Sequence, residues 1–174
     1  MFAAALAPAS AQSGKGIDLE NTLYLDVKYG RVVIEMLPDL APNHVARIKE
    51  LVREGFYDGI VFHRVIDGFM AQTGDPTGTG SGGSGKNLDA EFSSEIHVRG
   101  VVSMARAQSP NSADSQFFIV FDDAPWLDNQ YTMWGRVTEG MEHIDAMEKG
   151  EGQGGSVSDP DVIVKIQVAA DAKE

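Results

Sequence analysis

Hydrophobic and polar residues alternate in a series of short segments along the chain. Residues 22–36 contain two such segments, in which apolar side chains take every second position on either side of a turn at Tyr29-Gly30. Four later segments, 100–107, 115–121, 133–137 and 161–168, are short and similarly apolar. The pattern therefore predicts a hairpin near the N-terminus followed by several further short strands.

Two other segments repeat their apolar residues at helical spacing. The first, within residues 41–57, has Pro42 in a suitable place for a first turn and Gly55 as a stop. The second is predicted over residues 138–150, with Thr138 as its N-cap and Gly150 at its end. Their apolar stripes are Val45, Ile48, Leu51 and Val52 in the first, and Met141, Ile144 and Met147 in the second.

The order of these elements favours a mostly β fold. The two helices are far apart in the sequence and the strands do not alternate with helices, which argues against a doubly wound parallel sheet. We predict a closed, mostly antiparallel sheet with helices covering its open ends. The length of 174 residues suits one domain, which we place at residues 17–174.

Residues 1–16 stand apart from this domain. A short apolar run from Phe2 to Ala7 is followed by the small residues 9–11, which resemble a signal-peptidase site. The segment is either the remnant of an export signal or a disordered Ala-rich extension. The first alternative places the mature protein in the periplasm, and the second leaves it in the cytoplasm.

Composition narrows the possible partners and chemistry. With 14 Lys and Arg against 26 Asp and Glu, the net charge is −12, which argues against binding to a phosphate backbone. The absence of cysteine excludes a disulfide scaffold, a thiolate metal site and a Cys nucleophile. No apolar run approaches the roughly 20 residues of a membrane span. We expect a monomer with neither nucleic acid nor membrane as partner.

The motifs that suggest a cofactor lack the context that such motifs need. Residues 78–83 fit G-x-G-x-x-G, and residues 80–87 come within one residue of a P-loop. Neither has a strand before it and a helix after it, so the segment is interpreted as a flexible surface loop. The histidines at 44, 63, 97 and 143 lack metal-ligand spacing, and no G-x-S-x-G motif occurs. We expect no cofactor and no metal.

Residues 62–75 are predicted to form a strand, a turn and a second short strand, and Arg64 is the most unusual residue of the first. It lies between Phe62 and Ile66 on one strand face, where burying a charge is costly unless a partner is present. In residues 115–121 both faces are largely apolar, as expected for a strand that is buried on one side and lines a pocket on the other. Taken singly, these apolar residues could equally be core, with Arg64 paired to a carboxylate.

The order and spacing of two long segments resemble a known family. FHRVIDGFMAQTGDPTGTGSGGSG (62–85) and SMARAQSPNSADSQFFIVFDDAPWLDNQYTMWGRV (103–137) are similar to the signature regions of the cyclophilins, which are peptidyl-prolyl cis–trans isomerases. The resemblance extends from about Asn21 to Val168. It implies an eight-stranded antiparallel β-barrel capped by two α-helices, acting on proline-containing peptides and unfolded proteins. A cyclosporin-like inhibitor is a further implied ligand.

The resemblance also implies roles for individual residues. Arg64 matches the catalytic arginine and Gln72 the glutamine beside it. The proline pocket corresponds to Phe69, Met70, Phe118 and Leu127, the groove for the preceding residues to Ala105, Arg106 and Gln116, and the cyclosporin-associated tryptophan to Trp126. Tyr131 stands where many members have His, and Arg106 where many have Asn. A peptide-binding or chaperone module with incidental catalysis is the alternative function.

Overall fold

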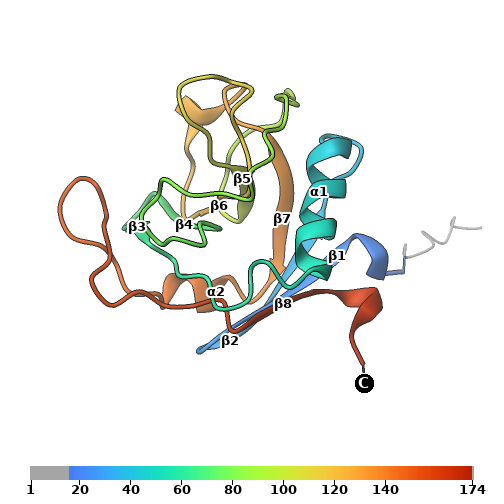
Figure 1. The fold of residues 1–174 in the computed structure, drawn as a ribbon, viewed down its shortest axis with the longest axis horizontal. Helices are drawn as coiled ribbons and strands as arrows, with labels where there is room; N and C mark the ends of the chain where they lie inside the picture. The colour runs from blue at the N-terminus through green and yellow to red at the C-terminus, as the bar shows by residue number, and fades with distance from the viewer. Residues whose placement is uncertain (1–15, 174) are drawn as a thin grey trace, which may run out of the picture.

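The computed structural model describes residues 16–173, so the predictions for residues 1–15 lie outside the described part of the chain (Figure 1). Eight strands and two α-helices carry the fold, and three short 3₁₀ helices complete it. The strands are β1 (Thr22–Val27), β2 (Gly30–Met36), β3 (Arg64–Ile66), β4 (Met70–Thr73), β5 (Val101–Met104), β6 (Phe117–Val120), β7 (Met133–Glu139) and β8 (Lys165–Val168). The helices are α1 (Pro42–Arg53) and α2 (Met141–Asp145), with 3₁₀ turns η1 (Leu19–Asn21), η2 (Pro125–Leu127) and η3 (Ala169–Asp171).

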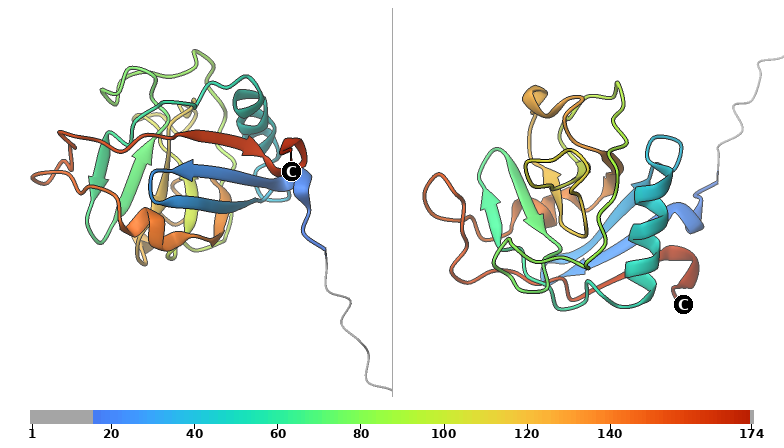
Figure 2. Two further views of the ribbon diagram at one scale, coloured as in Figure 1. Left: turned by 90° about the horizontal axis from the view of Figure 1, so that it is seen from below. Right: turned by 45° about the horizontal axis from the view of Figure 1, so that its top comes forward.

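All eight strands belong to one antiparallel sheet that curls on itself. The strand order is β3-β4-β6-β5-β7-β2-β1-β8, and Figure 2 shows β1, β2 and β8 side by side at one end and β3 and β4 at the other. The predicted mostly β, antiparallel fold with two helices is confirmed. The predicted hairpin is also present, with Val27 of β1 opposite Gly30 of β2.

The prediction of a closed barrel is wrong, because β3 and β8 are the two edges of an open sheet. β8 begins only at Lys165, although the alternating pattern starts at Asp161. The preceding residues instead make single backbone bonds to the segment before β3, with Phe62 N–H donating to Asp161 O at 2.8 Å. Isolated bridges such as Val61–Val162 span the gap without forming a ladder between the edge strands.

The main core lies inside the curl and is covered by α1. The four stripe residues predicted for this helix are all buried, and the helix begins at Pro42 as expected. Phe117 of β6 contacts Trp134 of β7 edge to face, with ring centroids 5.4 Å apart. Phe62 precedes β3 and is fully buried in this core, whereas Ile66 of β3 packs against a separate apolar cluster that includes Met70. Contrary to the prediction, Phe62 therefore does not share a strand face with Arg64 and Ile66.

The second helix is shorter than predicted. Thr138 is not its N-cap but a residue of β7, whose hydroxyl donates to Val33 O. Gly140 precedes the helix with φ of 81°, and a Cβ there would lie 2.3 Å from Arg31 O. Glycine is therefore required at this position because the strand turns into the helix against the backbone of β2. The helix ends at Asp145, before the predicted Gly150.

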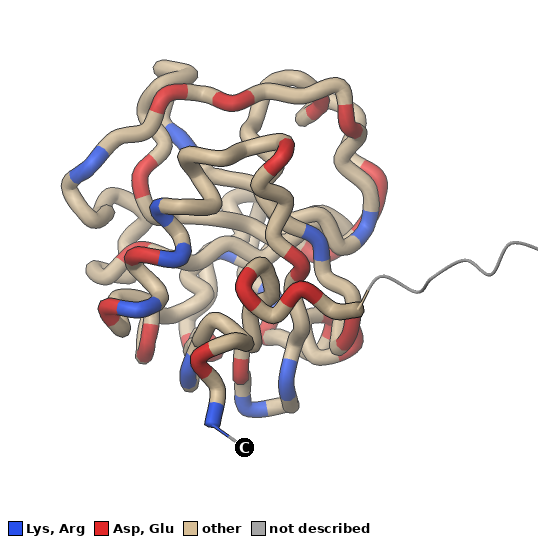
Figure 3. The backbone as a smooth tube through the Cα atoms, turned by 90° about the vertical axis from the view of Figure 1, so that its right-hand side faces the viewer, with Lys and Arg blue, Asp and Glu red and all other residues tan. Residues whose placement is uncertain are grey.

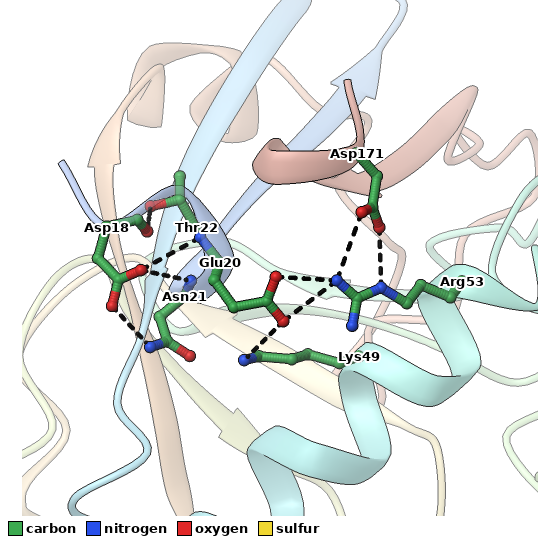
Figure 4. Close-up of polar contacts among 7 residues, drawn as sticks. All are labelled: Asp18, Glu20, Asn21, Thr22, Lys49, Arg53 and Asp171. Atoms are coloured by element: carbon green, nitrogen blue, oxygen red, sulfur yellow. Dashed lines mark hydrogen bonds and ion pairs between the residues drawn. The ribbon is translucent and has the colours of Figure 1, made fainter. Parts of the chain in front are cut away.

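Ion pairs connect the two ends of the described chain to α1. Arg53 of α1 donates to Glu20 in η1 and to Asp171 in η3 (Figure 4). The distance from Arg53 Nε to Asp171 Oδ2 is 2.8 Å. Elsewhere acidic and basic positions are interspersed rather than gathered into one basic patch on the face shown in Figure 3. Among residues 16–173, no helix combines the length and apolar character of a membrane span.

Candidate active site

The predicted site residues meet on the face of the sheet that points away from the main core. Arg64 of β3 lies opposite Gln72 of β4, and Gln72 lies opposite Phe118 of β6. Because side chains alternate along each strand, these three residues project from the same face. The same face carries a second apolar cluster that includes Met70, Phe118 and Leu127. The two faces of β6 therefore serve different clusters, as its two-sided apolar pattern predicts.

Two adjoining cavities contain all eleven predicted site residues. The first, of ≈ 250 Å³, is lined by Arg64, Phe69, Met70, Gln72, Ala105, Arg106, Phe118, Trp126, Leu127 and Tyr131. The second, of ≈ 320 Å³, includes Gln116 together with the Gly-rich loop. Gln72, Ala105 and Arg106 line both. The cavities thus form one continuous site whose two halves share these three residues.

The apolar half of the site is built from buried side chains and closed by aromatic rings. Met70, Phe118 and Leu127 are almost inaccessible to solvent. Phe118 contacts Tyr131 edge to face, with centroids 5.7 Å apart, and Phe69 lies 5.5 Å from the indole of Trp126. Trp126 is 61% exposed, so it forms the outer rim of this cavity. Such a pocket suits a small apolar ring.

Arg64 stands at the edge of this pocket, and both of its hydrogen-bond partners in the described part of the chain are neutral oxygen atoms. Its Nε donates to Gly154 O at 3.0 Å, and its Nη1 donates to Gln72 Oε1 at 3.1 Å. Gly154 belongs to the loop after α2, which extends beside β3 in Figure 1 and bonds to it through Val65 N–H and Gly155 O. Nη2 has no acceptor among residues 16–173. The guanidinium is therefore oriented by protein groups while part of its donor edge stays free.

A directional chain of amide groups connects Arg64 to the Gly-rich loop. Because Arg64 can only donate, Gln72 must present its oxygen to it and its Nε2 to Gln116 Oε1, 2.9 Å away. Gln116 Nε2 in turn donates to the carbonyl oxygens of Gly80 and Gly82, both at 2.9 Å. Arg64 at one end and the loop carbonyls at the other therefore favour the same orientation of both glutamines.

The Gly-rich loop binds a carboxylate of its own chain. The side chain of Asp75 accepts bonds from the backbone N–H groups of Thr77, Gly80 and Gly82 and from the Thr77 hydroxyl. Burial raises the pKa of Asp75, but these bonds outweigh burial and lower it to about 2. A Cβ at Gly82 would lie 2.1 Å from Asp75 Oδ1, which explains the glycine. The N–H groups that would hold a phosphate in a nucleotide site are therefore occupied.

Two residues that depart from the pattern of the resembled family contact each other. The guanidinium of Arg106 lies 4.7 Å above the ring centroid of Tyr131. Its Nε and Nη2 donate to Gln130 O at 3.0 and 2.9 Å, and its Nη1 donates to the carbonyl oxygens of Ala107 and Gln108. Arg106 is thus fixed across the junction of the two cavities.

One polar cluster beside the site was not found from the sequence. His97 Nε2 lies 3.0 Å from Ser103 Oγ, and His97 Nδ1 lies 3.0 Å from Asp128 Oδ1. These three residue types occur in hydrolase triads, but Ser103 is fully buried, donates to Thr132 O and lines neither cavity. Burial lowers the pKa of His97, partly offset by its bond to Asp128. The cluster instead anchors Asp128, which directly follows η2 and its pocket residues.

The remaining histidines do not form a metal site. Within the described part of the chain, no group of three or more His, Asp or Glu residues is arranged to hold a metal ion. His44 pairs with Glu91 at 2.6 Å, and neither residue lines either cavity. His63 is partly buried against the Gly-rich loop, and burial lowers its pKa.

Comparisons with known proteins agree on one family. The family model of cyclophilin type peptidyl-prolyl cis-trans isomerase/CLD matches residues 22–168. The probable peptidyl-prolyl cis-trans isomerase of Brucella suis is 52% identical over 182 residues, which cover 97% of this chain and 93% of that protein. The human peptidyl-prolyl cis-trans isomerase-like 3 is 45% identical over 133 residues, covering 74% of this chain and 81% of its own.

Solved structures show the same likeness. A cyclophilin from Hirschia baltica matches with a TM-score of 0.81 and 31% identity, covering 90% of this chain and 77% of that one. A cyclophilin type peptidyl-prolyl cis-trans isomerase from Cryptosporidium parvum, crystallised in the presence of the dipeptide Ala-Pro, matches with a TM-score of 0.78 and 31% identity. That match covers 84% of this chain and 98% of the other.

Proposed function

The chain belongs to the cyclophilin-type peptidyl-prolyl cis–trans isomerases, and from this premise we propose that Arg64 catalyses rotation about Xaa-Pro bonds beside an apolar proline pocket. The observation that supports this role is the placement of the Arg64 guanidinium, which lines the pocket and is oriented by two neutral acceptors. The substrates are proline-containing segments of unfolded or flexible proteins.

The reaction needs no nucleophile and no base. Rotation about the Xaa-Pro bond is slow because it breaks amide resonance, with a barrier of about 18–20 kcal/mol. In the twisted transition state the prolyl nitrogen regains a lone pair that it lacks in both planar isomers. A donor placed beside this nitrogen therefore stabilises the transition state more than the ground states. The free donor edge of Arg64 suits this role.

The other residues hold the substrate while the bond rotates. The buried wall of Met70, Phe118 and Leu127 receives the proline ring and excludes water, which strengthens the electrostatic contribution of Arg64. Gln72 holds the guanidinium through its hydrogen bond with Arg64 Nη1. The second cavity accepts the residues that precede the proline. An acceleration of about 10⁵ requires roughly 7 kcal/mol of differential binding, which a few oriented donors in a dry pocket supply.

The test measures isomerisation directly, by NMR exchange of an Ala-Pro peptide with no coupled protease. We expect the wild-type protein to accelerate exchange and Arg64→Ala to reduce the catalysed rate by about 10²–10³, the usual effect of removing one transition-state donor. Arg53→Ala is the matched control, because it removes an arginine of α1 that lines neither cavity. An equal loss in both variants would contradict a catalytic role for Arg64.

The same experiment separates catalysis from mere binding. A peptide-binding or chaperone module would bind the peptide equally well with arginine or alanine at position 64 and would accelerate exchange with neither. Chemical-shift titration of the same samples supplies the dissociation constants. The proposal requires that Arg64→Ala changes the exchange rate far more than it changes binding.

We also propose that the pocket accepts a cyclosporin-like inhibitor against Trp126. The indole is exposed, whereas Trp134, the other tryptophan, is fully buried. Binding at the rim should therefore change the fluorescence of Trp126 and be silent in Trp126→Phe. An unchanged wild-type spectrum at saturating inhibitor would contradict this proposal.

The compartment is a separate proposal. We propose that residues 1–11 act as part of an export signal and that the mature protein is periplasmic, on the basis of the small residues before Gln12. N-terminal sequencing of the protein from fractionated cells should find the mature chain in the periplasmic fraction. Recovery of uncleaved chain from the cytoplasm would favour the alternative, a cytoplasmic enzyme.

A further inference from the structure

The arginines of this protein divide into those that have a carboxylate partner and those that do not. Of the seven in the sequence, four form ion pairs within 4.0 Å: Arg31 with Asp26, Arg47 with Glu50, Arg53 with Glu20 and Asp171, and Arg99 with Asp145. Arg64, Arg106 and Arg136 have no carboxylate at that distance among residues 16–173. Two of these three line the proline pocket, in a protein whose net charge is −12.

Arg106 is held by several contacts, although no carboxylate among residues 16–173 lies within 4.0 Å of it. Its four hydrogen bonds end on the carbonyl oxygens of Ala107, Gln108 and Gln130, and the ring of Tyr131 covers one face. Carbonyl dipoles and an aromatic face orient a guanidinium without cancelling its net charge. The side chain is therefore prevented from turning toward a distant carboxylate of its own chain.

The position of Arg106 determines which substrate residue meets this charge. Arg106 lines both cavities, so a peptide with its proline in the first cavity and earlier residues in the second crosses Arg106 directly before the proline. The second cavity contains a charged group of opposite sign, Asp114, which is held by Ser84 and Gly85. Attraction for a substrate carboxylate is thus strongest at the junction and weaker further along the second cavity.

We propose that Arg106, positioned by Tyr131, makes this enzyme prefer Xaa-Pro segments in which Xaa is acidic. This inference rests on the proposed function and adds the substrate class. A carboxylate at roughly 5–6 Å in a partly solvated groove gains on the order of three- to tenfold in binding. Without Arg106, the overall negative charge would instead disfavour acidic peptides.

The test compares two peptides that differ only in charge, Ala-Glu-Pro and Ala-Gln-Pro sequences of equal length. For each we would measure Kd by chemical-shift titration and the catalysed rate by NMR exchange, at low salt. We expect the wild-type protein to favour the Glu peptide by about three- to tenfold in Kd and in catalysed rate at low substrate concentration. Added salt should shrink this ratio toward one.

Matched variants separate the effect of the Arg106 charge in the groove from the effect of the net charge of the whole protein. Arg106→Gln should lower the Glu/Gln ratio to about one, and Arg106→Lys should keep part of it, since lysine keeps the charge but loses the planar contacts. Arg136→Gln changes the net charge equally at a residue that lines neither cavity, and should leave the ratio unchanged. Tyr131→Leu should lower the ratio by releasing the guanidinium.

The result that overturns the inference is a wild-type ratio of one or less. A ratio that Arg106→Gln does not change, or that Arg136→Gln lowers equally, overturns it as well. If no peptide is isomerised at all, the proposed function fails, but the Kd ratio still decides the preference for a carboxylate.

Discussion

Arg53 and Arg64 use the same side chain in opposite ways. In the cluster of η1, α1 and η3, the guanidinium of Arg53 lies between the carboxylates of Glu20 and Asp171, and its charge is compensated within the fold (Figure 4). At the edge of the pocket, Arg64 is held by a backbone carbonyl and a glutamine oxygen, and no carboxylate among residues 16–173 lies within 4.0 Å of it. The first arrangement connects segments of the chain, and the second keeps a positive charge available to a ligand.

The difference indicates which arginines are suited to act on a substrate. A guanidinium that already has a carboxylate partner gains little from a further negative or lone-pair group, because its charge is compensated. One that is oriented by neutral dipoles keeps its full electrostatic effect without the freedom to turn away. The partners of a charged residue, rather than its exposure, therefore distinguish a structural role from a functional one in this protein.

Of the four substitutions that test this difference, replacing the planar guanidinium of Arg64 by another positively charged group should have the largest effect. In Arg64→Lys one ammonium nitrogen replaces the planar guanidinium, so the bonds to Gly154 O and Gln72 Oε1 are no longer made from two separate nitrogen atoms while a third faces the pocket. We expect the catalysed exchange rate of an Ala-Pro peptide to fall by about 100-fold, or about 2.7 kcal/mol. The melting temperature should change little, which a thermal scan checks. Retention of more than half of the activity would mean that charge alone is sufficient.

Asp75 is the acidic counterpart of Arg64, since neutral N–H groups hold its buried carboxylate. Its pKa of about 2 in the folded protein lies below the ordinary 3.8, so the ionised form stabilises the fold above about pH 4. This contribution of about 2 kcal/mol is lost as the pH falls from 4 to 2. Asp75→Asn should lower the free energy of unfolding by about that amount at pH 7. Urea unfolding measured at a series of pH values should also show a smaller loss of stability in the variant than in the wild type as the pH falls from 4 to 2. A variant with wild-type stability at pH 7 would contradict this.

Adding a carboxylate to the pocket should make Arg64 resemble Arg53. Gln72→Glu places a negative oxygen where a neutral one now lies 3.1 Å from Arg64 Nη1. We expect the catalysed rate to fall by about tenfold, equivalent to about 1.4 kcal/mol, because the charge becomes paired. Gln72→Ala is the control, since it removes the contact without adding charge. The comparison fails if the Glu variant is as active as wild type.

Breaking the structural cluster should have the smallest effect. Arg53 and its two partners are substantially exposed, so Arg53→Ala should lower the free energy of unfolding by about 1 kcal/mol or less. Chemical denaturation at low and at 1 M salt checks this, and the difference from wild type should shrink at high salt. Peptide isomerisation should be unchanged. A large loss of activity would show that the cluster is coupled to the pocket.

Elements whose pattern is local could be predicted from the amino-acid sequence. The alternation on both sides of Tyr29-Gly30 predicted the first hairpin, and the stripe that follows Pro42 predicted α1. The resemblance of residues 62–85 and 103–137 to the cyclophilins implied which eleven residues belong together, and the structure places all of them around two adjoining cavities. Such patterns can be recognised in a sequence because the periodicity of apolar residues and the spacing of motif residues depend only on neighbours along the chain.

Features that depend on contacts between distant segments became apparent only in the folded structure. The sheet stays open because the residues before β8 bond singly to the segment before β3, and α2 starts late because Gly140 packs against the backbone of β2. The sequence contained Arg106 and Tyr131 as separate departures, and only folding brings the guanidinium onto the ring. Likewise, no pattern could tell that the Gly-rich loop encloses Asp75, since hydrogen bonds between segments follow from three-dimensional packing and not from period.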